Sequence, residues 1–431
     1  MAIPSSCYNT HMSRAIKHIY NFNQGDRKIG IVSFMIFFFV LFDGVLMYAA
    51  PIVMTHNNLS AGTVGLILGL SSVAGMAFDI IMSRLIQNMT YRSIFFFMLV
   101  VAAIYPFVLF GANSVTMYLS AMVIWGLYYN LYNVGTLDFV SRAGDDVVGI
   151  STDIDTDHAR EFGVLKVFDG LGYMIAPLLG SVLIINMLNT DHSPYLMLVL
   201  ILPAFSFFFL LINYHKHKSK VSHFSRHIHR LITSKGKGFN FLKEINIWRV
   251  VMKGLMPVLL LTLVINMMDS AVWTVGPLYS ESLGGGYFML AYTIPPLLVG
   301  WVAGRVANRW GKRHTATMAL FIGSILMFGI GFTSVLSLLY VMSFAVSMCY
   351  SLAWPIINSI YADNINRDES IHEETESIED LFTNMGDVLG PIIAGYSAQY
   401  AGSHHTFIYI GAIGVLCSVV LFSLKKDTLN Y

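Results

Sequence analysis

Two aspartates lie deep inside long apolar stretches of the chain, where a carboxylate is unusual. Asp43 occurs in "FDGVLMYAAP" and Asp269 in "DSAVWTVGP", and neither stretch contains a Lys or Arg. Burial away from a cation favours the protonated form of a carboxylic acid. A carboxylate that alternates between its charged and neutral forms is what a proton-coupling site requires. Asp387, flanked by glycines, is the third candidate for this role.

Two other acids in apolar stretches have basic neighbours at helical spacing. Asp138 precedes Arg142 by four residues, and Asp169 follows Lys166 by three. Side chains three or four residues apart meet on the surface of a helix. We therefore expect local ion pairs at both positions rather than proton-coupling sites.

Aromatic and amide side chains recur in the same stretches and are the candidates for binding a small molecule. In "WGLYYNLYN", Trp125, Tyr129 and Tyr132 occupy positions i, i+4 and i+7, which share one face of a helix. The other candidates are Tyr48, Asn133, Asn266, Trp273, Tyr350, Trp354 and Asn358. Such groups suit sugars, nucleosides or flat organic cations, whereas an anionic substrate would usually meet a buried Lys or Arg. The alternative role of these aromatics is to anchor helices at a membrane interface.

The composition shows which kind of protein positions these residues. Of 431 residues, 55% are hydrophobic and 12% are charged, about half the charged fraction of a water-soluble protein. Mean hydropathy is +0.64. A membrane-spanning helix needs about 20 mostly apolar residues, and twelve such segments are present: 29–53, 62–84, 93–112, 115–137, 163–187, 193–213, 250–275, 285–306, 314–332, 336–358, 381–399 and 406–424. The sequence therefore predicts an all-α polytopic membrane protein.

The distribution of basic residues predicts its orientation. The loops that follow odd-numbered segments, such as "THNNLSAG" and "YSESLGGG", contain no Lys or Arg, and all 26 basic residues fall on the other side. Because Lys and Arg concentrate in cytoplasmic loops, we expect both termini to be cytoplasmic, in a multi-pass protein of the cytoplasmic (inner) membrane. The predicted parts are a cytoplasmic N-terminal segment (1–28), a first six-helix bundle (29–213), a basic cytoplasmic linker (214–249), a second bundle (250–424) and a cytoplasmic tail (425–431).

The sequence indicates that the two bundles are copies of one six-helix unit. Asp43 and Asp269 are each followed by a proline eight residues later, in the first segment of each half. The loop "SRLIQNMTYRS" has its counterpart in "GRVANRWGKRH", and the glycine-containing run "GLGYMIAPLLG" in "GDVLGPIIAG". Parallel repeats of this kind are related by an axis along the membrane normal. We expect the glycine runs to allow close helix packing.

These motifs resemble those of the major facilitator superfamily of secondary transporters. "GRVANRWGKR" is similar to the family's G-x-x-x-D-R-x-G-R-R loop, and in the degenerate first copy only Arg92 keeps its basic character. The corresponding positions are Gly304, Arg309, Gly311, Lys312 and Arg313, with Asn308 in the acidic position of the motif. The run ending at Gly180 resembles the G-x-x-x-G-P-x-x-G element of proton-driven exporters, with Ala176 in place of the glycine before proline. The resemblance implies two six-helix bundles that rock about a central site.

A gate at the cytoplasmic face is a further expectation. The cations of the matched loop, with Arg92 and Arg305, share that face with two acidic loops, "AGDDVVGISTDIDTDHARE" and "ADNINRDESIHEETESIED". Ion pairs between these sets would hold the face shut in one state and part in the other. The alternative is that they are simply solvated charges.

The functional expectation is a secondary active transporter that moves a small neutral or cationic organic solute by alternating access, coupled to protons. The alternatives are a drug or siderophore-type efflux antiporter, or a non-transporting membrane sensor on the same fold. No G-x-x-x-x-G-K-[ST], H-E-x-x-H or G-x-S-x-G motif occurs, so an enzyme is not expected. We expect no cofactor, metal site or nucleic-acid partner, and a monomer in the lipid bilayer.

Overall fold

In the computed structural model the described residues are 24–85, 89–145, 154–189, 192–214, 241–367 and 372–423, and every regular element among them is an α-helix. The first half contains α2 (Gln24–His56), α3 (Ala61–Leu85), α4 (Tyr91–Gly111), α5 (Val115–Asp145), α6 (Ile154–Asn189) and α7 (Ser193–Tyr214). The second contains α9 (Phe241–Ser282), α10 (Tyr287–Thr293), α11 (Pro295–Trp310), α12 (Lys312–Ile330), α13 (Leu336–Arg367) and α14 (His372–Ser423). Most of the predicted linker lies outside the described residues.

The helices account for the twelve predicted segments. Among the described residues, nine helices are long and apolar enough to cross a membrane, or ten when α10 and α11 count as one bent span. Helix α14 covers the last two predicted segments, because Gly402 (φ 83°, ψ 157°) interrupts it. Helix α5 accounts for the remaining predicted segment, 115–137, although it is not apolar enough to be counted among the nine. Its polar aromatic and amide residues lower its hydropathy.

The predicted span 285–306 is not one continuous helix, which corrects the sequence-based expectation. Helix α10 ends before Ile294, and α11 starts at Pro295. Pro295 and Pro296 lack the backbone N–H that would continue the ladder of α10. The axis also turns by 70° between Val299 and Val302.

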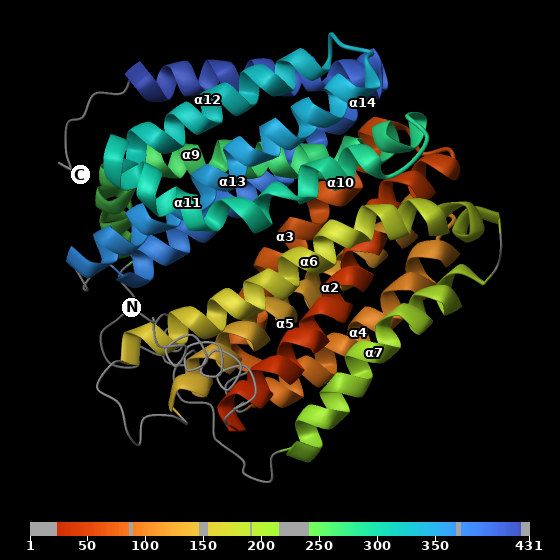
Figure 1. Cartoon of the computed structure of the whole chain (residues 1–431), viewed down its shortest axis with the longest axis horizontal. Coiled ribbons are helices and arrows are strands. Elements are labelled where there is room, and N and C mark those ends of the chain that lie inside the picture. The colour runs from red at the N-terminus through yellow and green to blue at the C-terminus, as the bar shows by residue number, and fades with distance from the viewer. Residues whose placement is uncertain are drawn as a thin grey trace, which may run out of the picture.

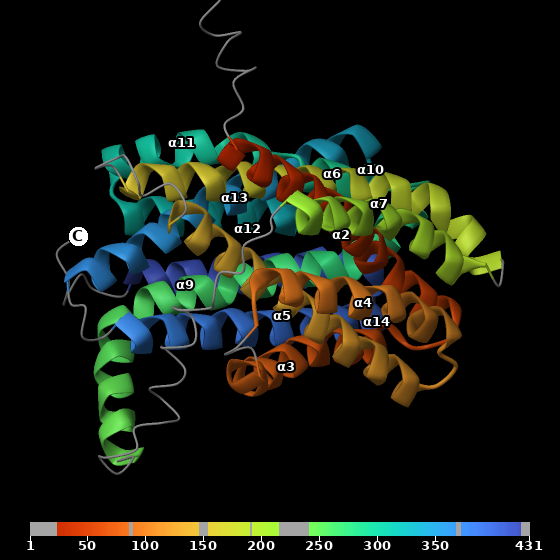
Figure 2. The same ribbon diagram turned by 90° about the horizontal axis from the view of Figure 1, so that it is seen from below.

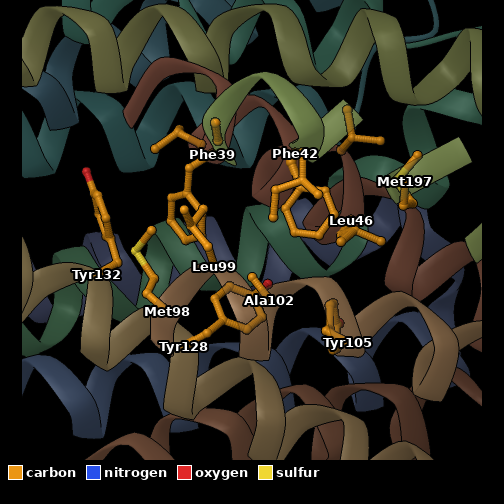
Figure 3. Packing of buried hydrophobic residues seen from close by; sticks show 14 of the residues in the cluster. Phe39, Phe42, Leu46, Met98, Leu99, Ala102, Tyr105, Tyr128, Tyr132 and Met197 are labelled. Atoms are coloured by element: carbon orange, nitrogen blue, oxygen red, sulfur yellow. The ribbon is translucent and has the colours of Figure 1, made fainter. Parts of the chain in front are cut away.

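The two halves have separate hydrophobic cores. Figure 1 shows α2, α4, α5, α6 and α7 grouped together and α9 to α13 grouped opposite them. In the first core, Phe39 and Phe42 of α2 face Leu99 of α4 and Tyr128 of α5 (Figure 3). The second core is built from α9 to α14, and Tyr48 of α2 also belongs to it. Each half therefore has a hydrophobic core of its own, and Tyr48 connects the two.

Glycines bring equivalent helix pairs close together in the two halves. On α6, a Cβ at Gly172 would lie 3.0 Å from the backbone oxygen of Phe37 on α2. On α14, a Cβ at Gly386 would lie 2.6 Å from the backbone oxygen of Leu263 on α9. The expectation that the glycine runs serve close packing is confirmed. In both halves a glycine lets two helices pack backbone to backbone, α6 against α2 and α14 against α9, as two copies of one unit require.

Side-chain contacts join the two halves at one end of the molecule. The basic end carries Arg92 and Lys312, and the opposite end carries Glu281 and Gln399. At the opposite end, the Gln399 side chain of α14 accepts a 3.2 Å hydrogen bond from the backbone N–H of Gly62 on α3. Helices α3 and α14 run beside each other in Figure 2.

Candidate functional site: a buried carboxylate among aromatic donors

Asp43 has no exposed surface and accepts hydrogen bonds from three aromatic side chains. Trp125 Nε1 (2.9 Å) and the Tyr128 hydroxyl (2.6 Å), both on α5, donate to Oδ1. The Tyr173 hydroxyl on α6 donates to Oδ2 at 3.0 Å. Within the described part of the chain, Asp43 has no cationic partner. Its charge is therefore balanced by neutral donors alone, an arrangement that tolerates both the ionised and the protonated acid.

Close helix packing sets the position of Tyr173. Gly44 follows Asp43, and a Cβ there would lie 2.6 Å from that of Ala176 and 3.1 Å from the Tyr173 ring. A larger residue at Gly44 would push α6 away from α2 and lengthen the bond to Oδ2. The Tyr173 ring also meets Trp273 of α9 edge-on, with centroids 6.1 Å apart. Tyr173 thus contacts the carboxylate of one half and an aromatic side chain of the other.

The predicted aromatic face of α5 is continuous with this cluster. The rings of Trp125, Tyr129 and Tyr132 follow one another at 6.1 and 6.0 Å. The Tyr132 hydroxyl donates to Asp169 Oδ1 at 2.9 Å, and Lys166 pairs with Asp169 Oδ2 at 3.1 Å. The expected local ion pair at Asp169 is confirmed. These side chains form a row of polar aromatic groups on the inner side of the first half.

The second half offers a simpler version of the same site. The Tyr292 hydroxyl of α10 donates to Asp269 Oδ1 at 2.7 Å. Asp387 of α14 interacts electrostatically with Asp269. Two carboxylates share this region, whereas the first half combines one carboxylate with three donors. The repeat has therefore kept the position of the acid and changed its surroundings.

The other predicted binding residues differ in burial and in their hydrogen-bond partners. Tyr48 is fully buried, and its hydroxyl donates to Glu281 Oε1 of the other half at 2.6 Å. Asn266 is buried and donates to the backbone oxygen of Thr262. The buried Tyr350 hydroxyl lies 4.0 Å from the sulfur of Met327. The remaining three differ in exposure: Trp354 is half-buried, and Asn133 and Asn358 are exposed.

The predicted gate residues occupy the basic end. Lys312 Nζ lies 2.5 Å from Asp363 Oδ2, an ion pair between α12 and α13 of the same half. The Arg313 guanidinium donates to the backbone oxygen of Leu421 at 3.3 Å. Arg92 lies over the ring of Tyr91. Four more residues are exposed there: Gly304, Asn308, Arg309 and Gly311. Of the two acidic loops, 146–153 and 368–371 lie outside the described residues.

Three residues of the cluster were missed as candidates from the sequence. Tyr128 lies three residues after Trp125 and so shares its helix face, which was a usable signal. Tyr173 and Tyr292 are donors to acids on other helices, and only the three-dimensional packing places them there.

Comparison with known proteins decides the family. The family model described as Major Facilitator Superfamily matches residues 32–370. The chain belongs to this superfamily. It is accordingly a multi-pass membrane transporter and not an enzyme, as the sequence predicted.

The relatives include a quinolone resistance protein and an efflux pump homolog, and the structural neighbours are transporters. The quinolone resistance protein NorA of Staphylococcus aureus is 23% identical over 422 residues, covering 93% of this chain and 97% of that protein. A multi-drug resistance efflux pump PmrA homolog of Lactococcus lactis is 29% identical over 159 residues, 33% of this chain and 37% of its own. The crystal structure of the nucleoside transporter NupG has a TM-score of 0.68 at 11% identity, covering 93% of this chain and all (100%) of that chain. That of the human organic anion transporter MFSD10 has a TM-score of 0.59 at 14% identity, covering 92% and 99%. The structural likenesses confirm the fold.

Proposed function

We propose that the protein is a secondary active transporter that couples proton movement to transport of a small neutral or cationic organic solute. The observation that carries the proposal is Asp43, fully buried and held by Trp125, Tyr128 and Tyr173 with no described cation beside it. A structural ion pair would supply a permanent counter-charge. This carboxylate has neutral donors instead, and two of them, Tyr128 and Tyr173, can also accept a hydrogen bond, which suits a group that gains and loses a proton.

The aromatic row supports the solute class. Tyr129 is 37% exposed and lies between Trp125 and Tyr132. Aromatic faces attract flat apolar groups and organic cations. Asp169, at the end of the row, is paired with Lys166, so the pair adds no net positive charge that would attract an anionic solute.

Alternating access fits the contacts between the halves. Tyr48–Glu281 and Gly62–Gln399 close the opposite end. The Lys312–Asp363 pair at the basic end lies within one half. We propose that this conformation is open toward the basic end, that the basic end is cytoplasmic, and that the predicted gate residues close it in the other state.

The second candidate function is a drug-efflux antiporter, for which the direction of net flux is export. It rests on the likeness to NorA, a quinolone resistance protein, which extends over 93% of this chain. An importer of a neutral solute would use the same site with the opposite direction of net flux.

The test uses inside-out membrane vesicles with an imposed pH gradient and a fluorescent pH reporter. A panel of sugars, nucleosides and organic cations is added to vesicles with wild-type protein or with Asp43→Asn. A compound that dissipates the gradient with the wild type and not with Asp43→Asn supports the proposal. Equal responses from both proteins would remove Asp43 from coupling, and a wild type that leaves the gradient unchanged with every compound would contradict proton coupling itself.

A further inference from the structure

Asp43 is sealed from its surroundings, so a proton can reach it only through a side chain that touches it. Its three contacts differ in what they can transmit. The indole N–H of Trp125 donates but cannot accept. The Tyr128 hydroxyl can donate and accept, yet it is fully buried, and its ring packs against that of Tyr105 in the core of the first half. Tyr173 can donate and accept, and it is half-buried at the boundary between the two halves.

The donor pattern also identifies the oxygen that takes the proton. Oδ1 of Asp43 accepts from both Trp125 and Tyr128. A proton on Oδ1 would face an indole N–H that has no alternative to donating. Oδ2 has a single partner, the Tyr173 hydroxyl, which can turn from donor to acceptor. The protonated acid therefore donates from Oδ2 to Tyr173.

The next polar group beyond Tyr173 is Tyr129. The two tyrosine side chains interact with each other. Tyr129 also interacts electrostatically with Asp169 of its own half and with Asp387 of the other half. With 37% of its surface exposed, it is the most accessible member of the aromatic row where we place the solute.

We propose that Tyr173 is the proton relay of Asp43 and connects the sealed carboxylate to the side of Tyr129 that a solute or water can reach. This deepens the proposed function and rests on it. For proton uptake, the hydroxyl proton of Tyr173 passes to Asp43 Oδ2 while the tyrosine oxygen receives a proton from a hydronium ion beside Tyr129, which leaves as neutral water. The O–H bond of Tyr173 is thus broken and re-formed, Asp43 becomes neutral, and release reverses each step.

Every titratable group that acts on Asp43 is a possible proton relay and must be compared with Tyr173. Those in the described residues are Tyr105 of α4, Tyr128, Tyr129 and Tyr132 of α5, and Asp169 and Tyr173 of α6. Of these, Tyr128 and Tyr173 alone donate a hydrogen bond to the carboxylate. Blocking Tyr173 should therefore slow proton exchange without removing the acid.

The experiment compares two activities in proteoliposomes with ethidium as the flat cationic probe. Net ethidium transport driven by a pH gradient needs proton exchange at Asp43, whereas ethidium counterflow at equal pH does not. In Tyr173→Phe we expect gradient-driven transport to fall by about 100-fold, the lower end of what a proton-transferring side chain contributes. We expect counterflow to stay near the wild-type rate. Tyr173→His, which keeps a group that donates and accepts, should restore part of the driven transport.

Tyr105→Phe is the matched control, because Tyr105 is equally buried near Asp43 but makes no hydrogen bond to it in the described structure. It should leave both activities unchanged. Driven transport at the wild-type rate in Tyr173→Phe would overturn the relay alone. An equal loss in Tyr105→Phe, or no recovery in a folded Tyr173→His, would also overturn it by making the effect one of packing. A wild type that transports ethidium without proton movement would overturn the proposed function as well.

Discussion

The Tyr48 hydroxyl of α2 donates a 2.6 Å hydrogen bond to Glu281 Oε1 of α9, and this bond joins the two halves at the end opposite the basic loops. Tyr48 is fully buried and belongs to the hydrophobic core of the second half, although its helix belongs to the first. A side chain shared in this way must leave one of its two environments when the halves separate. The pair is therefore a candidate latch for the conformation described here.

Breaking that latch should expose the interface at the opposite end. Ser181 of α6 lies beside the Tyr48 hydroxyl, and a cysteine there would report on access to this end. In a cysteine-free background carrying Ser181→Cys, we expect Tyr48→Phe and Glu281→Gln to raise labelling by a membrane-impermeant maleimide severalfold, because a hydrogen bond to a charged group is worth about 1.5–3 kcal/mol. Tyr118→Phe is the control, since the Tyr118 hydroxyl accepts from Asn57 of the same half. Equal labelling in all variants would show that the bond does not hold this end closed.

The glycine contact between α9 and α14 should be sensitive to a single methyl group. In Gly386→Ala the new Cβ would lie 2.6 Å from the backbone oxygen of Leu263, and overpacking of this kind costs about 1–3 kcal/mol. Gly254→Ala, on a helix with nothing within 4 Å of the added atom, should be neutral or slightly stabilising. Thermal unfolding in detergent measures both. A Gly386→Ala protein as stable as Gly254→Ala would contradict the close packing.

The pair between Lys312 and Asp363 should matter to transport more than to stability. Both side chains are partly exposed, so the pair is worth less than about 1 kcal/mol. We expect Lys312→Met and Asp363→Asn each to slow transport without changing the unfolding temperature, and the double variant to be no slower than either. The charge swap Lys312→Asp with Asp363→Lys should recover part of the rate. Wild-type transport in both single variants would remove the pair from the gate.

Tyr129 should contribute directly to solute affinity. Its ring is exposed between those of Trp125 and Tyr132. Loss of one aromatic face that contacts an organic cation should cost about 1–2 kcal/mol, roughly a 5- to 30-fold rise in Kd. Equilibrium binding of ethidium to Tyr129→Ala measures this. Tyr409→Ala, which removes an exposed ring from the last part of α14, should bind like the wild type, and an equal loss there would place the solute elsewhere.

The helical architecture could be predicted from the sequence because it depends on composition and on the length and repetition of apolar segments. Apolar length predicted the segments, and the repeat of Asp43 and Asp269 predicted two equivalent halves. Even the interruption at Gly402 follows from the loop "QYAGSHH". The break before Pro295 was missed, although two consecutive prolines that lack N–H groups were visible there.

The partners of the buried acids were less predictable, because they depend on contacts between helices far apart in the chain. Asp43 was singled out by its depth, but nothing in one helix shows that Gly44 lets Tyr173 reach Oδ2. Tyr48 was predicted to bind solute on its residue type, and in the structure its hydroxyl is bonded to Glu281. Local pairs such as Lys166–Asp169 were predictable, since both residues lie on one helix.

The most direct measurement of the central claim is the proton balance of solute binding. Ethidium is added to purified protein in weakly buffered detergent solution, and the pH change is recorded with the amount bound. For the wild type we predict that about one proton is exchanged per solute bound, since binding is linked to the protonation of a single acid. For Asp43→Asn we predict binding without a pH change. The same proton exchange in Asp43→Asn and the wild type would contradict the role of Asp43.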